Sequence, residues 1–128
     1  MDSSGYIMTN AHVVQGATSI RITLAPLVGD PEPDLDSSEP PGTFVARVAE
    51  IDRDMDLALL KIEADGLAAL LFADSARVAQ GDVVLAIGSP VNFRNALSIG
   101  VVSATNRSLG DDDPIPYIQT DASINPGN

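Results

Sequence analysis

One histidine and one aspartate have the residue types and the sequence context for acid–base chemistry. His12, the only histidine of the chain, lies in the run T-N-A-H-V-V, and Asp56 follows 44 residues later (56 minus 12), directly before L-A-L-L. A neutral imidazole accepts a proton near neutral pH, and a carboxylate on its other nitrogen fixes the tautomer and stabilises the imidazolium. Because the apolar run after Asp56 is typical of a buried strand, we expect this carboxylate to be partly desolvated. The pair predicts a general base and its orienting partner.

Each of these residues also has an ordinary structural interpretation. A single histidine in a domain is more often structural than catalytic, and an aspartate before a strand often caps a loop, a role for which Asp52 and Asp54 are the better candidates. Near the end of the chain, Gly127 is a candidate for a plain turn. A glycine there also permits a sharp turn and close substrate approach, because it has no Cβ. Main-chain N–H groups in such a turn can bind a developing oxyanion.

The elements that must position these residues are short strands separated by Gly, Pro, Asp and Asn, a rhythm typical of all-β chains. One helical turn is expected at 10–14, capped by Thr9 or Asn10, and a tight polar connection at 52–56. Gly100 is expected to mark a bulge or bend. The strands are expected at 6–8, 19–24, 43–51, 57–62, 82–87, 98–104 and 115–120, with a polar, proline-rich loop at 26–42 and a crossover at 64–80.

Composition excludes several classes of protein. The net charge is −11, with 18 acidic and 7 basic residues, which argues against binding to nucleic acid or anionic lipid. Aromatic residues make up 4% of the chain, so we expect a core of Val, Ile, Leu and Ala. The absence of cysteine excludes a thiol nucleophile, disulfides and thiolate zinc sites. The sequence shows neither a signal peptide nor an apolar run of the roughly 18 residues that a membrane span needs.

Two acidic clusters, at 30–39 and 111–113, account for part of the charge. We interpret them as solvated loops that aid solubility. Calcium binding is the alternative, but two prolines interrupt the first cluster, two more follow it, and no twelve-residue calcium loop is present. No metal site or cofactor is predicted.

Five blocks occur in order along nearly the whole chain: G-Y-I-M-T-N-A-H-V-V at 5–14, D-M-D-L-A-L-L-K-I at 54–62, G-D-V-V-L-A-I-G-S-P at 81–90, S-I-G-V-V-S-A at 98–104 and Y-I-Q-T-D-A-S-I-N-P-G-N at 117–128. Together they resemble the HtrA/Deg family of trypsin-like serine endopeptidases. The resemblance implies His12 as general base, Asp56 as its carboxylate and the Gly127 N–H as one oxyanion donor. The family pattern continues with S-G-G, which puts the nucleophilic serine directly after Asn128. Asp121 is expected to be a structural carboxylate that supports the loop before the nucleophile, and no chemical role is assigned to it.

The resemblance also implies the fold, two β-barrels of the trypsin-like kind. Residues 1–63 then belong to the first barrel, 64–80 to the crossover, and 81–128 to the N-terminal part of the second. Relative to that template both ends are incomplete: a first strand and the late strands of the second barrel fall outside the sequence. We therefore expect these 128 residues alone to be inactive, marginally stable and prone to associate through exposed strand edges.

The function implied by the resemblance is ATP-independent hydrolysis of peptide bonds in unfolded or misfolded proteins, a task of protein quality control. The resemblance also implies an extracytoplasmic setting, periplasmic or membrane-tethered, and allows a homotrimer or larger oligomer and a downstream PDZ domain. Two alternatives stay open: a pseudo-protease or chaperone-like module that holds peptide without cutting it, and a β-barrel adaptor unrelated to proteolysis.

Overall fold

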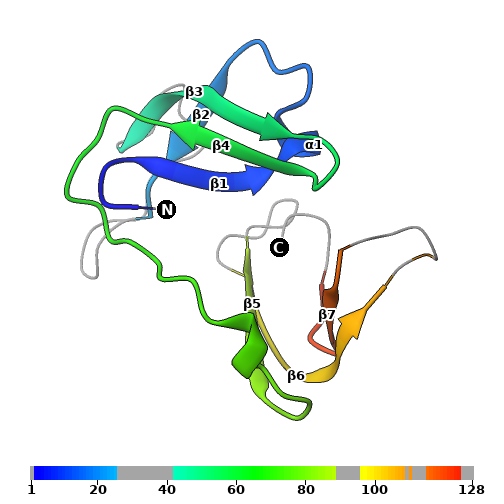
Figure 1. The fold of residues 1–128 in the computed structure, drawn as a ribbon. Coiled ribbons are helices and arrows are strands. Elements are labelled where there is room, and N and C mark those ends of the chain that lie inside the picture. Colours follow the sequence, from blue (N-terminus) through cyan, green and yellow to red (C-terminus); the bar gives the residue numbers. More distant parts are fainter. Residues whose placement is uncertain (1, 26–41, 89–95, 109, 111–114, 125–128) are drawn as a thin grey trace. The chain divides into compact units, whose positions relative to one another are not determined.

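Strands joined by turns make up most of the protein (Figure 1). The computed structural model describes residues 2–25, 42–88, 96–108, 110 and 115–124, and the chain divides into two compact units, Met1–Leu71 and Phe72–Asn128. The elements are β1 (Tyr6–Asn10), α1 (Ala11–Val14), β2 (Ile20–Thr23), β3 (Thr43–Asp52), β4 (Leu57–Lys61), the 3-10 turn η1 (Ser75–Arg77), β5 (Val83–Gly88), β6 (Ala96–Arg107) and β7 (Tyr117–Thr120). The predicted all-β class is confirmed.

The first unit is a four-stranded antiparallel sheet in the order β1-β4-β3-β2. β1 and β4 pair from Tyr6↔Lys61 to Asn10↔Leu57. The ten-residue strand β3 pairs with β2 through its first half and with β4 through its second half. A register shift between Val48 and Glu50 interrupts the second pairing, and such bulges bend a strand and increase its twist. β3 therefore lets the sheet curl (Figure 1).

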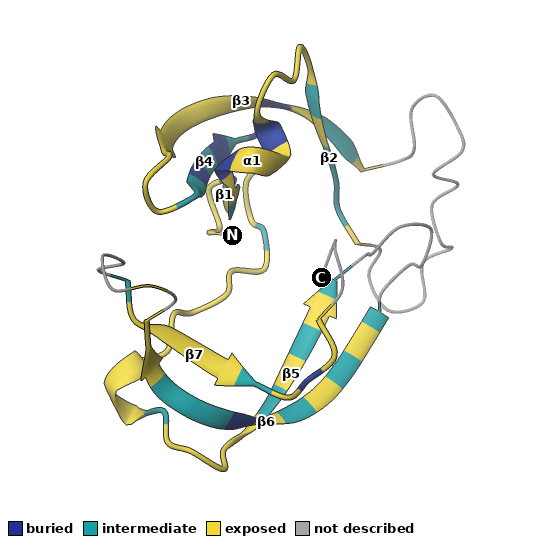
Figure 2. Ribbon diagram, turned by 90° about the vertical axis from the view of Figure 1, so that its right-hand side faces the viewer, coloured by how far each residue is buried: buried dark blue, intermediate teal, exposed yellow. Residues whose placement is uncertain are grey.

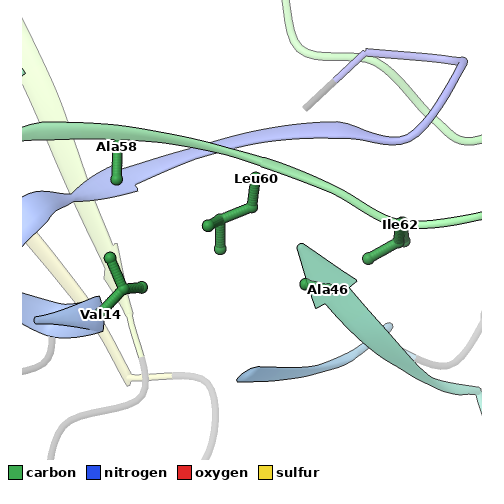
Figure 3. Close-up of a cluster of buried hydrophobic side chains, with 5 residues drawn as sticks. All are labelled: Val14, Ala46, Ala58, Leu60 and Ile62. Carbon is green, nitrogen blue, oxygen red and sulfur yellow. The ribbon is translucent and has the colours of Figure 1, made fainter. Parts of the chain in front are cut away.

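Alternation along β4 selects the core of the first unit. Ala58 and Leu60 are buried there, and Ile62 follows directly after the strand. Val14 from α1 and Ala46 from β3 complete the buried cluster (Figure 3). The cluster contains no aromatic side chain, as the composition predicts. Burying an aliphatic side chain of this kind stabilises the fold by roughly 1.5–3 kcal/mol, so the core fixes α1 and β4 against each other.

The second unit is a three-stranded antiparallel sheet in the order β5-β6-β7. The twelve-residue strand β6 pairs with β5 through Ala96 to Val101 and with β7 through Val102 to Arg107. Both β6 and β1 are longer than expected, because hydrogen-bonded pairing continues beyond their apolar runs. β7 is shorter and begins after Pro116, which has no N–H to donate to a neighbouring strand.

Gly100 corrects one expectation. The pairing of β5 with β6 runs without interruption through Val84↔Gly100, so no bulge lies there. A Cβ at position 100 would instead lie within 2.6 Å of Ala122 Cα and of Asp121 Oδ1. The glycine is needed because the chain after β7 passes directly over β6.

One face of β5 and β6 carries exposed apolar side chains. Leu85 and Ile99 are cross-strand partners, as are Ile87 and Leu97, and all four are more than half exposed. Exposed and half-buried residues alternate along both strands (Figure 2). In the described part of this unit the buried apolar residues are Val102 and Ala122, so its packing is thinner than that of the first unit.

Residues 64–80, the expected crossover, contain little regular structure. Leu70 and Leu71 are exposed, and the regular element in the segment is η1, whose cap Asp74 accepts a hydrogen bond from the N–H of Ala76 at 3.0 Å. The boundary between the two compact units falls after Leu71. The division into barrels and crossover stays a prediction.

Candidate active site

The β1–β4 register brings the two chemically interesting residues together. β1 ends at Asn10, opposite Leu57 at the start of β4. His12 is the second residue of α1, which follows β1 directly, and Asp56 is the residue before β4. Residues 44 positions apart in the sequence therefore meet at one end of the sheet.

His12 and Asp56 contact each other twice. Nδ1 of the imidazole lies 2.7 Å from Asp56 Oδ2, and the main-chain N–H of His12 donates to Asp56 Oδ1 at 2.9 Å. An ionised carboxylate only accepts hydrogen bonds, so its position assigns the imidazole proton to Nδ1. Nε2 then carries the free lone pair, and it has no hydrogen bond among the described residues. The arrangement is that of a general base at Nε2 whose tautomer is fixed by a carboxylate hydrogen-bonded to Nδ1.

Asn10 also binds Asp56, which the sequence did not reveal. It occupies the N-cap position of α1 but makes no side-chain capping bond. Its Nδ2 instead donates to the Asp56 carbonyl at 3.1 Å and to Asp56 Oδ2 at 3.2 Å. Asn10 therefore holds the expected N-cap position, but the capping bond expected from its side chain is absent from the described structure. The start of α1 is bound by the residue that precedes the neighbouring strand β4: the N–H of Ala11 donates to the Asp56 carbonyl at 3.0 Å.

These hydrogen bonds lower the pKa of Asp56 below its usual value. The main-chain N–H of His12 has the largest effect, followed by the imidazole, and Asn10 adds a smaller one. Partial desolvation opposes them but does not prevail. The side chain of Asp56 is 45% exposed and that of His12 is 68% exposed. The pair is open to solvent in the described structure, so the expected desolvation of the carboxylate is modest.

The turn that presents Asp56 is pre-formed by its own residues. The carboxylate of Asp52 accepts hydrogen bonds from the N–H groups of Asp54 and Met55, both at 3.0 Å, and the N–H of Asp56 donates to the Arg53 carbonyl at 3.4 Å. Asp52 thus has the loop-capping role. Asp56 itself has a left-handed backbone with φ 53°, a conformation that aspartate tolerates better than most residues.

A pocket of about 180 Å³ adjoins the imidazole. Its walls include Gln15 and Gly16 at the end of α1 and Ile51 and Arg53 from β3 and the following turn. Apolar and charged side chains thus border the same small volume.

The segment leading to the end of the chain is fixed to β6. Asp121 Oδ1 accepts a hydrogen bond from the N–H of Val101 at 2.7 Å, and Thr120 Oγ1 donates to the Val101 carbonyl at 2.9 Å. Ser98 Oγ donates to the Ser123 carbonyl at 2.7 Å. Asp121 is therefore a structural carboxylate that binds β6, and its support of the loop before the nucleophile stays a prediction.

Other predicted features cannot be placed. Gly127 and Asn128, the acidic clusters at 30–39 and 111–113 and nearly all of the loop at 26–42 lie outside the described residues. Among the residues that are described, no group of three or more His, Asp or Glu is arranged to hold a metal ion. No helix in that part of the chain has the length and apolar character to cross a membrane.

Comparison with known proteins gives the family of the chain. The family model for the trypsin-like peptidase domain matches residues 1–128. A probable periplasmic serine endoprotease, DegP-like, of Marinomonas sp. (strain MWYL1) is 45% identical over 124 residues, which are 97% of this chain and 24% of the relative. A protein of the same description from Hahella chejuensis (strain KCTC 2396) is 41% identical over 128 residues, again 24% of its length. The chain thus spans about a quarter of these relatives.

Solved structures give the same result. The HtrA-type protease AlgW with a decapeptide aligns with a TM-score of 0.80 and 35% identity, over 99% of this chain and 35% of that one. AlgW with a tripeptide aligns with the same score and 36% identity, over 100% of this chain and 38% of that one. The matches in sequence and in fold cover essentially the whole chain. It therefore belongs to the trypsin-like peptidases, and among them to the HtrA/Deg family.

Proposed function

We propose that the full-length protein is a serine endopeptidase in which His12 is the general base and Asp56 its orienting carboxylate. The observation that carries this proposal is the double contact of Asp56 with His12, at 2.7 Å to the ring and 2.9 Å to the main chain. It leaves Nε2 as an acceptor directed away from the carboxylate. Membership of the family supplies the nucleophile, a serine that we place directly after Asn128.

The proposed reaction moves one proton at each step. His12 Nε2 takes the serine hydroxyl proton while the oxygen attacks the substrate carbonyl, and Asp56 stabilises the resulting imidazolium. The N–H groups of Gly127 and of the serine bind the oxyanion. The C–N bond then breaks, and Nε2–H passes its proton to the leaving amine. Water, activated by the same nitrogen, hydrolyses the acyl-enzyme and restores the serine.

The substrates we propose are unfolded or misfolded polypeptides. Two observations support a peptide: solved structures of AlgW contain one, and a pocket of about 180 Å³ lies beside His12. An extended, unfolded chain presents its backbone to an exposed imidazole more readily than a folded one does. A role in protein quality control is proposed from the resemblance to the HtrA/Deg family.

The setting is proposed from the relatives. They are described as periplasmic, so we place the full-length protein outside the cytoplasm. They are about four times as long as this chain, which leaves room for a PDZ domain and for contacts that form a trimer or a larger oligomer.

The test is cleavage of unfolded casein by the full-length protein. We expect His12→Ala to lower kcat by roughly four to six orders of magnitude. Val13→Ala, which shortens an exposed neighbour on the same helix, is the matched control and should retain activity. Absence of cleavage by the natural protein, together with tight binding of casein, would instead indicate a peptide-binding module without peptidase activity.

A further inference from the structure

We propose that Asn10 is a positioning residue that holds Asp56, and through it the imidazole of His12, in the orientation needed for proton transfer. The inference rests on the proposed function for its catalytic meaning. Its structural basis is independent of that function, because it concerns only contacts within the first unit. Asn10 is the residue that joins the main chain and the side chain of Asp56 through a single group.

The contacts of Asn10 account for both donors of its amide. Nδ2 lies 3.1 Å from the Asp56 carbonyl and 3.2 Å from Asp56 Oδ2. An amide NH₂ has two N–H groups, so both bonds form at once. Both neighbours are acceptors, and the amide must therefore face them with its nitrogen rather than its oxygen. This orientation explains why Asn10 makes no capping bond to α1.

Asp56 needs such support because its backbone is in the left-handed region, with φ 53°. Left-handed conformations of non-glycine residues cost free energy and persist where the surroundings hold them. The Asp56 carbonyl is held by two donors, the Ala11 N–H at 3.0 Å and Asn10 Nδ2 at 3.1 Å. Of these, Asn10 alone also binds the carboxylate. It therefore couples the strained backbone to the direction in which the side chain points.

The consequence for His12 concerns its Nδ1. Asp56 Oδ2 is shared between His12 Nδ1 at 2.7 Å and Asn10 Nδ2 at 3.2 Å. Without the amide, the carboxyl group can rotate about its terminal bond, a torsion with broad minima. The two contacts with His12, at 2.9 Å to Oδ1 and 2.7 Å to Oδ2, also restrain that rotation, and the Asn10 amide adds a third restraint. Loss of Asn10 should therefore loosen the contact that fixes the proton on Nδ1.

The proposal predicts a change in tautomer that nitrogen NMR measures directly. We would label the full-length protein with ¹⁵N-histidine, assign the His12 signals by their loss in His12→Ala, and record them at about pH 9, above the usual titration range of imidazole. The natural protein should show the Nδ1–H tautomer. Asn10→Ala should shift the population toward Nε2–H. Asn10→Asp should shift it further, because a second carboxylate then faces Asp56 and like charges repel.

Two further variants make the test specific. Asn10→Ser keeps one donor and should recover part of the Nδ1–H population, which also guards against a variant that fails to fold. Gln80→Glu makes the same amide-to-carboxylate change at an exposed residue of the second unit, which in the described structure neither binds Asp56 nor lines the pocket beside His12. It should leave the tautomer unchanged. A natural tautomer in both Asn10→Ala and Asn10→Asp would overturn the proposal.

Kinetics complete the experiment. In the full-length protein, Asn10→Ala should lower kcat by about ten- to a hundred-fold with little change in KM, because misplacement of a catalytic group affects the chemical step. Equal kcat values for the natural protein and Asn10→Ala would overturn the positioning role in catalysis. If the natural protein cleaves no peptide while the tautomer shifts as expected, the peptidase proposal fails and the coupling of Asn10 to His12 stands.

Discussion

Asp56 binds both the side chain and the main chain of His12: the imidazole Nδ1 lies 2.7 Å from Oδ2 and the main-chain nitrogen lies 2.9 Å from Oδ1. Its carbonyl accepts the N–H of Ala11 at 3.0 Å. Asp56 thus does for α1 what a side-chain N-cap normally does, although it comes from a turn on another strand. Orientation of the ring and formation of the helical turn depend on the same residue.

The first prediction separates the charge of Asp56 from its shape. Asp56→Asn preserves size and tolerates the left-handed backbone, but its amide can present an N–H to Nδ1 and so favour the other tautomer. We expect kcat to fall by about 10⁴ in the full-length protein, as in trypsin when the corresponding aspartate becomes asparagine. Casein hydrolysis measures the effect. A loss of less than about ten-fold would show that Asp56 does not orient the base.

The second prediction concerns pH. The folded state lowers the pKa of Asp56, chiefly through the His12 N–H. A lowered pKa stabilises the fold at pH values above the unfolded pKa of about 3.9, and this contribution disappears as the pH falls through the lower folded value. Urea unfolding of the natural protein and of Asp56→Asn should therefore differ most near neutral pH. The difference should shrink below about pH 4, whereas a gap that widens there would contradict the assignment.

The third prediction tests the close approach of the chain after β7 to Gly100 on β6. Gly100→Ala places a methyl group against Ala122 Cα and Asp121 Oδ1, both 2.6 Å from the new Cβ. Backbone must move to relieve the overlap, so we expect a loss of about 1–3 kcal/mol in the free energy of unfolding. Gly110→Ala, where no atom of the described residues lies within 4 Å of the new Cβ, should stay within about 0.5 kcal/mol. Equal losses in the two variants would show that the approach is not tight.

The fourth prediction concerns the core that fixes α1 to β4. Leu60 is 1% exposed, and Leu60→Ala should lower the free energy of unfolding by about 2–5 kcal/mol. Val45→Thr changes a side chain that is 71% exposed and keeps it β-branched, so it should cost less than about 0.5 kcal/mol. Urea titration monitored by circular dichroism measures both. A small effect at Leu60 would mean that the first unit can repack.

The sequence predicted the pair but not what holds it. His12 and Asp56 were recognisable because each lies in an informative run of residues, and their meeting follows from the pairing of β1 with β4. The partnership of Asn10 with Asp56 joins residues 46 positions apart, and no local pattern shows which way an amide side chain turns. A capping role was the better guess from position alone. The need for Gly100 was equally hidden, because it arises from a backbone that passes over β6 from another part of the chain.

The pairing of β1 with β4 also makes the geometry of the site independent of the length of chain between His12 and Asp56. The register ends at Asn10↔Leu57, and no residue between Thr23 and Thr43 takes part in it. Lengthening that stretch costs loop-closure entropy only slowly, roughly 0.6 kcal/mol for each doubling. The spacing of 44 residues can therefore change, while the strand register keeps His12 next to Asp56. An affinity tag or a foreign epitope inserted after Thr23 should leave the imidazole where it is.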